Sequence, residues 1–284
     1  MAIGKAEKAA YNDEIKDYKV AVDTGQKQVK DIIVKKKQSP KLSAYYNIEL
    51  AVTHMRIIGL YLKMSDLSMD MLGIKNDAYL NEARKAFYLV VQMLEEGVGN
   101  EVDRSLRTND QHIAAISKID PAQLLKFMQK LHSVFEELKI KVGGAEDAME
   151  GGGGSKVVSG GSKWRWSFVE IQARVAVITK NITSFSDIAK LRDPRTPFFR
   201  ERKKLMVLTL DSLNEAAKQY RTKYELAGKA REDMKKTLEL LSALRKIHVL
   251  FGESDEAMKL KNVIDAGKQA LEAEDVAKEK KKKK

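Results

Sequence analysis

The sequence predicts an all-α protein, and three observations support this fold class. Only four prolines interrupt 284 residues, so long stretches lack the residue that breaks helices most strongly. Residues of high helix propensity, above all Lys, Glu, Ala, Leu and Met, dominate the composition. Apolar residues recur at spacings of three and four, and no convincing run alternates polar and apolar residues as a half-buried strand does.

The first predicted helix spans residues 7–36 and carries the most regular apolar pattern of the chain. Its apolar residues follow steps of four and three, with Gly25 as a weak position where we expect a close approach or a slight bend. Ser39-Pro40 ends the helix. The pattern predicts lengthwise packing on another helix, within the chain or between chains, and the helix predicted over 197–251 is one candidate. The seam residues are Tyr11, Ile15, Tyr18, Val22, Val29 and Ile32.

Four further helices are predicted before the composition changes. The first, over 41–71, is apolar around much of its circumference, which predicts a central position. Asn76-Asp77 is typical of a cap for the next helix, which ends near Gly97. A shorter helix is predicted over 101–118. Asp120-Pro121 then predicts a helix start with Asp as the N-cap and Pro at the first helical position.

A glycine-rich stretch over 143–162 divides the chain. It lacks the Gly-Lys-Ser/Thr sequence of a phosphate-binding loop, so we interpret it as a flexible linker. It separates an N-terminal helical region, 1–142, from a C-terminal long-helix region, 163–277. Residues 278–284 are six lysines and one glutamate, and they predict a basic disordered tail.

The C-terminal region is organised around its longest predicted helix, Pro197 to Phe251. This stretch has no further proline, has Gly228 as its only interior glycine, and repeats Leu, Tyr and Ala at helical spacing. We expect one helix of about 50 residues or two nearly collinear ones, a rod of roughly 75 Å. Such a rod exceeds a compact domain of this length, which predicts an elongated protein. A helix over 167–191 precedes it, and a last helix begins at Ser254.

Composition and spacing argue against an enzyme and against several classes of partner. The net charge of +12 suits an acidic partner but is spread too evenly for a nucleic-acid groove. No run approaches the ~20 apolar residues of a transmembrane helix. Carboxylates lie on Lys-rich helical faces, where i,i+4 pairs such as Glu232 with Lys236 account for them. With no cysteine and with isolated histidines, we predict no catalytic residue, no cofactor and no metal; the histidines are His54, His112, His132 and His248.

Three features are candidates for partner contact. Both tryptophans lie two positions apart, so they point in different directions on a helix, and packing at the linker or contact with a partner both remain open. Two consecutive phenylalanines in the 193–200 corner cannot both face one core, so one of them caps the corner or meets a partner. The terminal lysines are either solvated or a tether to an acidic surface or anionic lipid. The predicted interface is Trp164, Trp166, Arg195, Phe198, Phe199 and Arg200, and the basic tail is Lys280, Lys281, Lys282, Lys283 and Lys284.

The chain resembles the flagellar-coiling proteins of Leptospira, which sheath a periplasmic flagellar filament. The resemblance lies in the size, the Lys-rich helical composition, the Trp164-Arg165-Trp166 helix and the Asp-Pro-Arg-Thr-Pro-Phe-Phe corner at 193–199. It implies a V-shaped all-α subunit with two arms, exported to the periplasm. Many copies would lie along a flagellin core beside other sheath proteins and bend the filament into the coiled shape that motility requires. The N-terminus departs from an exported precursor, so we expect that a signal peptide was removed.

A second function stays open at this stage. A cytoplasmic coiled-coil adaptor or membrane-surface scaffold would use the heptad pattern and the basic tail to bind anionic lipid. Salt-sensitive liposome binding that is lost when Lys280–Lys284 are removed would favour this scaffold over a sheath protein.

Overall fold

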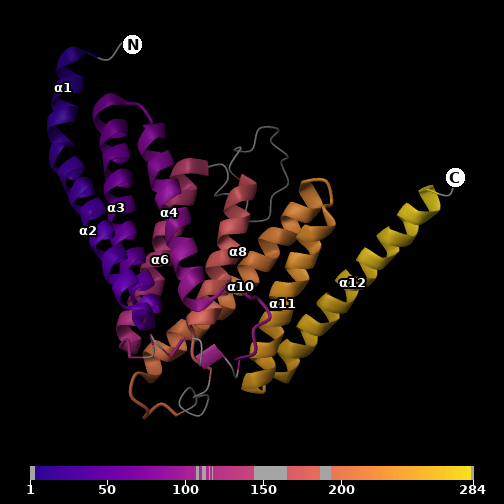
Figure 1. Ribbon diagram of the computed structural model, residues 1–284. Helices are drawn as coiled ribbons and strands as arrows, with labels where there is room; N and C mark the ends of the chain where they lie inside the picture. Colours follow the sequence, from indigo (N-terminus) through magenta and orange to yellow (C-terminus); the bar gives the residue numbers. More distant parts are fainter. Residues whose placement is uncertain are drawn as a thin grey trace. The chain divides into compact units, whose positions relative to one another are not determined.

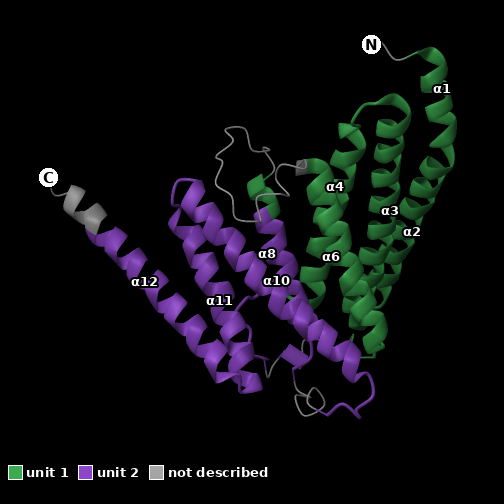
Figure 2. Cartoon of the chain, turned by 180° about the vertical axis from the view of Figure 1, so that it is seen from behind, with its two compact units in different colours: residues 1–99, 114–168 green, residues 100–113, 169–284 purple. Residues whose placement is uncertain are grey.

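The computed structural model describes residues 4–106, 109–110, 113–114, 116, 118–143, 165–185 and 193–282. Within these residues the regular structure is helical and contains no strand (Figure 1), so the all-α prediction is confirmed. The chain divides into two compact units (Figure 2). Unit 1 comprises 1–99 and 114–168, and unit 2 comprises 100–113 and 169–284. The predicted linker lies outside the described residues from position 144 onward.

The predicted N-terminal seam forms two successive helices of unit 1, α1 (Lys5–Glu14) and α2 (Lys16–Gln38). The break between them is at Ile15, whose N–H still donates to the Tyr11 carbonyl at 3.0 Å. A short 3-10 turn, Pro40–Leu42, leads to α3 (Ser43–Leu72), and α1 and α2 both pack on α3. The seam therefore packs within the chain, and α3 is the helix that it contacts. The buried seam residues are Tyr11, Ile15, Val22 and Ile32.

Gly25 lets α2 approach α3 closely, as the sequence predicts. A Cβ atom built at this position would lie 2.9 Å from Cγ1 of Ile57 on α3, closer than a Cβ normally tolerates.

We expect Gly25→Leu to destabilise unit 1 by about 1–2 kcal/mol. Overpacking against Ile57 outweighs the gain in helix propensity, which for a Gly replacement is at most about 1 kcal/mol. Gly59→Leu is the matched control, because Gly59 is an exposed glycine of α3 with nothing within 4 Å of its added Cβ, and it should be neutral or stabilising. Urea unfolding of both variants measures the difference. Equal effects at the two positions would contradict the close approach.

The rest of unit 1 follows the predicted start positions. The cap residue Asn76 begins α4 (Asp77–Val98), and its Oδ1 accepts a hydrogen bond from the Tyr79 N–H at 3.3 Å. Asp120 begins α6 (Pro121–Gly143), and its Oδ1 accepts from the Ala122 N–H at 2.8 Å. Helix α3 packs on both α4 and α6 and so takes the predicted central position. The fully buried core includes Leu50, Ile58, Leu62, Phe87, Val90, Leu94, Met128, Leu131, Phe135 and Leu138.

The predicted rod over 197–251 is wrong, whether as one helix or as two collinear ones. The chain forms α10 (Phe199–Leu226) and α11 (Arg231–Phe251), which pack side by side as a helical hairpin (Figures 1 and 2). Gly228, with φ 89°, and Lys229, with φ 55°, are both left-handed, a conformation that ends a helix. The Lys229 N–H donates to the Tyr224 carbonyl at 3.0 Å, so the last turn of α10 is closed.

An ion pair spans this reversal, with 2.8 Å between Lys223 Nζ and Asp233 Oδ1. Gly228 is thus a C-terminal helix signal. The sequence alone does not reveal this signal, because apolar residues at helical spacing resume after Gly228.

Helix α8 (Arg165–Ile182) contributes its residues from 169 onward to unit 2. It ends at Ile182, so the predicted end at 191 is too late; the Thr183 N–H already bonds the Lys180 carbonyl at 3.2 Å in a tighter turn. Residues 186–192 lie outside the described part of the chain.

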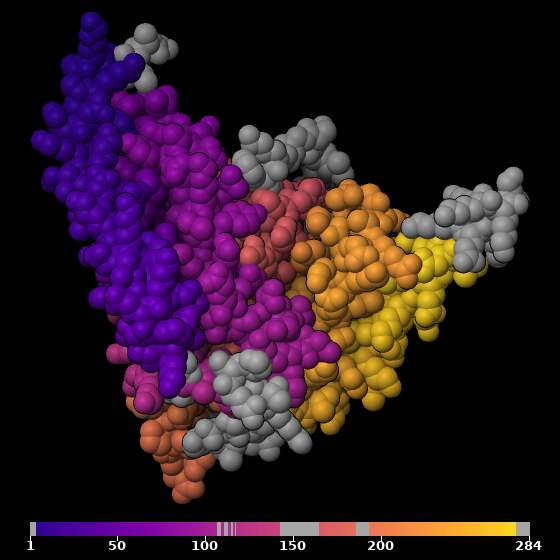
Figure 3. Space-filling model, viewed as in Figure 1, coloured from indigo at the N-terminus to yellow at the C-terminus, as the bar shows by residue number. Residues whose placement is uncertain are grey.

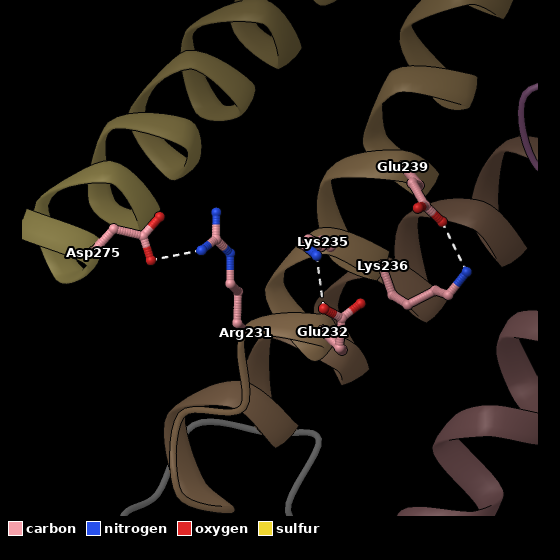
Figure 4. Close-up of polar contacts among 6 residues, drawn as sticks. All are labelled: Arg231, Glu232, Lys235, Lys236, Glu239 and Asp275. Atoms are coloured by element: carbon pink, nitrogen blue, oxygen red, sulfur yellow. Dashed lines mark hydrogen bonds and ion pairs between the residues drawn. The ribbon is translucent and has the colours of Figure 1, made fainter. Parts of the chain in front are cut away.

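Helix α12 (Ser254–Lys282) packs on α11 with one narrow stripe, Ala257, Ile264 and Leu271. An ion pair joins the two helices, with 2.5 Å between Arg231 Nη1 and Asp275 Oδ1 (Figure 4). The helical backbone continues to Lys282, which differs from the predicted disordered tail over 278–284. Lys283 and Lys284, and the side chains from 277 onward, lie outside the described residues.

The predicted i,i+4 pair between Glu232 and Lys236 does not form. Glu232 pairs instead with Lys235 at 2.7 Å, and Lys236 pairs with Glu239 at 2.9 Å, both at i,i+3 spacing (Figure 4). Hydrogen bonding to Lys235 lowers the pKa of the Glu232 carboxyl, although both side chains are too exposed for the pair to matter much for stability.

Candidate interaction surface

The predicted corner at 193–200 is two successive turns that lead into α10. The Thr196 N–H donates to the Asp193 carbonyl, and the Phe199 N–H donates to the Thr196 carbonyl, each at 3.1 Å. The Asp193 carboxylate accepts from the Arg195 backbone N–H at 3.0 Å. Arg202, one turn into α10, donates from Nη1 to the Pro197 carbonyl at 2.7 Å. These bonds fix the backbone on both sides of Phe198.

Phe198 has a backbone conformation that its side chain disfavours. Its φ of 61° and ψ of 25° place it in the left-handed region, where a bulky residue costs of order 1–3 kcal/mol. The residue is nevertheless 41% exposed, so burial of the ring offsets only part of that cost. A strained backbone that holds an aromatic ring at the surface is typical of a functional site rather than of a core contact.

The other predicted corner residues lie around this ring in sequence and differ in exposure. The Arg195 side chain is 91% exposed and pairs weakly with Asp193 at 3.2 Å. Arg200 is exposed. Phe199 is half-buried, and Nζ of Lys203 lies 6.0 Å from its ring centroid. Of the two consecutive phenylalanines, Phe198 is therefore the one presented to solvent.

The tryptophan pair is described only in part. Trp166 is half-buried in the first turn of α8, and Cζ of Arg165 lies 4.8 Å from its ring centroid, a cation–π geometry. Trp164 lies outside the described residues. Trp166 belongs to unit 1, whereas the corner belongs to unit 2.

Unit 2 contains a buried polar centre that the sequence interpretation missed. Lys180, on α8, is only 1% exposed. Its pKa is lowered to about 8, chiefly by burial and also by nearby Arg104 and Lys246, while Asp103 and Glu101 oppose the shift. Arg104 is ion-paired with Glu101, and Lys246 with Asp103. A lysine with a depressed pKa in a cleft would suggest a catalytic amine.

The polar contacts beside Lys180 are structural and are made by neighbouring residues. The Asn109 side-chain amide donates to the Thr183 carbonyl at 2.8 Å, and the Phe185 N–H donates to Asp110 Oδ1 at 3.3 Å. These bonds attach the segment 100–113 to the end of α8, which explains why that segment belongs to unit 2. The only hint in the sequence is the polar run Thr179-Lys180-Asn181 within a helix rich in Val and Ile.

Neither the histidines nor the carboxylates assemble a metal site within the described part of the chain, where no group of three or more potential ligands is found. Burial lowers the pKa of His54, and it lowers the pKa of half-buried His132 to about 4. His248 Nδ1 lies 2.5 Å from Glu253 Oε2 at the end of α11, and His112 lies outside the described residues. In the same residues, no helix is long and apolar enough to span a membrane.

A sequence model of the TP0443 family matches residues 7–147 and 154–275. The chain belongs to the TP0443 family. The match covers most of both compact units and is interrupted only within the glycine-rich stretch, so the two units together are the family's unit of sequence. No curated protein and no solved structure matches the chain.

Proposed function

We propose that this TP0443-family member is a non-enzymatic structural protein of the periplasmic flagellar filament sheath. After export it assembles in many copies along the flagellin core, beside other sheath proteins, and promotes the coiling of the filament that motility requires. The resemblance of the corner and of the Lys-rich helices to flagellar-coiling proteins supports this proposal.

The observation that carries the proposal is the corner at 193–200. A sheath subunit needs contact sites on its sides, and an exposed aromatic ring flanked by exposed arginines has the composition of an interface anchor. Phe198 stays at the surface although its backbone is strained, and Arg195 and Arg200 supply charge for an acidic partner. A catalytic role finds no comparable support, because Lys180 lies within structural contacts.

Filaments purified from cells with and without the gene test this proposal. We expect the filaments without the protein to be thinner and less curved in negative-stain images. Complementation with the unchanged chain should restore both properties, whereas the Arg195→Glu, Arg200→Glu double variant should restore neither. Filaments of unchanged diameter and curvature in the deletion strain would refute the sheath role.

One observation favours a second candidate, a membrane-surface scaffold. Because α12 remains helical to Lys282, its lysines are held on an ordered backbone at one end of the chain. Vesicles containing anionic lipid should then bind the chain in a salt-sensitive manner, and a chain ending at residue 279 should lose that binding. Equal binding by both chains would remove this candidate.

A further inference from the structure

A groove between α2 and α3 leaves apolar surface uncovered on unit 1. Its volume is about 520 Å³. Val20, one of its lining residues, is 59% exposed; the residues of α1 and α2 are coloured indigo in Figure 3. The apolar lining is Val20, Ala21, Gly25, Ile57 and Leu60, and the polar residues are Asp17, Thr24, Gln28, Thr53 and Arg56.

The groove is a consequence of Gly25. Without a side chain at this position, α2 and α3 approach closely and leave a hollow flanked by larger residues. Such a hollow has room for a large apolar side chain together with neighbouring residues of the same segment, and its walls are already fixed by the packing of Val22 and Ile57 in the core of unit 1.

We propose that this groove receives the 193–200 corner of a second copy of the chain, with Phe198 inserted between α2 and α3. The inference deepens the proposed function, since it rests on self-association along the filament and names the two surfaces that meet. Phe198 supplies the exposed aromatic side chain, and the groove supplies an uncovered apolar floor.

Charge complementarity supports a second copy as the occupant. Asp17 is an exposed carboxylate at the groove, and it matches the arginines that flank Phe198. Arg56 is an exposed cation at the groove, and Glu201 lies in the first turn of α10 beside the corner. The groove therefore offers one charge of each sign, and the corner offers the opposite charge for each.

The proposed contact joins two different surfaces of the same chain. A contact of this kind is heterologous, so each bound copy still offers a free groove or a free corner. Unless the geometry closes into a ring, repetition yields an open helical array. This property fits a subunit that coats a filament.

Disulfide trapping tests the contact directly, because the chain has no cysteine. One variant carries Thr24→Cys in the groove, and a second, tagged variant carries Arg200→Cys at the corner. After mild oxidation of the mixture we expect a cross-linked species that contains one chain of each kind. Each variant has a single cysteine, so that link can only join two copies. Lys85→Cys, at an exposed position of α4, replaces Thr24→Cys as the control and should give no more than background.

Charge reversal provides a second measurement that does not depend on cross-linking. Asp17→Arg and Arg200→Asp should each weaken concentration-dependent association by roughly five- to tenfold in sedimentation experiments, and the two variants mixed together should recover much of it. Circular dichroism should show all of these exposed-site variants folded. Failure of the mixture to recover association, or a Thr24–Arg200 cross-link no stronger than the Lys85 control, would overturn the inference.

The failures of the two proposals are distinguishable. The Arg200→Asp variant could be lost from filaments while the Asp17→Arg and Val20→Glu variants are retained. In that case the corner contacts a different sheath component, and only the groove contact is refuted. If copies cross-link as expected but filaments do not change when the gene is deleted, the groove contact is supported and the sheath role is refuted. A Thr24→Cys, Arg200→Cys double variant that closes only within one chain would also overturn the inference.

Discussion

Replacement of Lys180 by Met is expected to stabilise unit 2 at neutral pH by up to about 3 kcal/mol. The folded chain lowers the pKa of this lysine from 10.5 to about 8 because the ammonium is buried and lies near Arg104 and Lys246. At about 1.4 kcal/mol per pKa unit, that difference is the free energy by which folding disfavours the charged form. Methionine has a similar length and no charge, so it fills the same space without this penalty.

The pH dependence follows from the same pKa difference. Between pH 8 and 10.5 the unfolded chain keeps the Lys180 proton that the folded chain has lost, so the free energy of unfolding rises with pH. Below pH 8 both states are charged and the full penalty applies. The wild-type chain should therefore gain stability between about pH 7 and 9.5, whereas the Lys180→Met variant should lack this gain.

Urea unfolding of both chains at the two pH values measures this effect. Burial raises the pKa of Tyr220 to about 12, and the hydrogen bond to Glu274 raises the pKa of Tyr224 to about 12. Both tyrosines therefore stay protonated in the folded chain between pH 7 and 9.5. Lys218→Met is the matched control, because Lys218 is exposed on α10 of the same unit; it should change stability by less than about 0.5 kcal/mol. A Lys180→Met variant less stable than wild type at pH 7 would mean that the ammonium makes favourable contacts that exceed its desolvation.

Local chemistry explains why several elements of the fold are predictable from the sequence. The carboxylate or amide of an N-cap residue satisfies backbone N–H groups two or three positions away, so Asn76 and Asp120 mark helix starts without any tertiary information. The seam from Tyr11 to Ile32 is equally local, because its spacing alone defines one apolar face.

The hairpin of α10 and α11 is not predictable in this way. One glycine inside a helix costs only about 1 kcal/mol, so Gly228 is compatible with both a continuous helix and a chain reversal. Packing of α11 on α10 decides between them, and it depends on residues far apart in the sequence. The burial of Lys180 is not predictable from the sequence for a similar reason. Part of its surroundings comes from residues 100–113, which precede the glycine-rich stretch.

The sequence does not reveal which phenylalanine of the corner is exposed. Consecutive aromatic residues on a helix start cannot share one core, which identifies Phe198 and Phe199 as a pair but not which of them faces solvent. The left-handed backbone at Phe198 decides this, and it is set by the turn bonds around Pro197 and by Arg202.

Removal of the Phe198 ring is expected to separate stability from assembly. Phe198→Ala and Phe198→Gly delete the same side chain contacts, but only glycine adopts φ 61° without strain. The Gly variant should therefore be more stable than the Ala variant by about 1 kcal/mol, which urea unfolding will measure. Binding to filaments purified from the deletion strain should fall by roughly 30-fold or more in both variants, because each loses the central aromatic anchor, worth about 2 kcal/mol or more.

The comparison is decisive because a purely structural role predicts a different ranking. If Phe198 only capped the corner, filament binding would follow stability, and the Gly variant would bind better than the Ala variant. If the ring is the anchor, binding depends on the ring and not on stability, so the two variants bind equally weakly and Phe198→Tyr binds nearly as well as wild type. Phe199→Ala is the matched control, because Phe199 is the half-buried neighbour. This variant should be less stable than wild type and should still bind filaments. Unchanged stability with lost filament binding would identify Phe199, not Phe198, as the anchor.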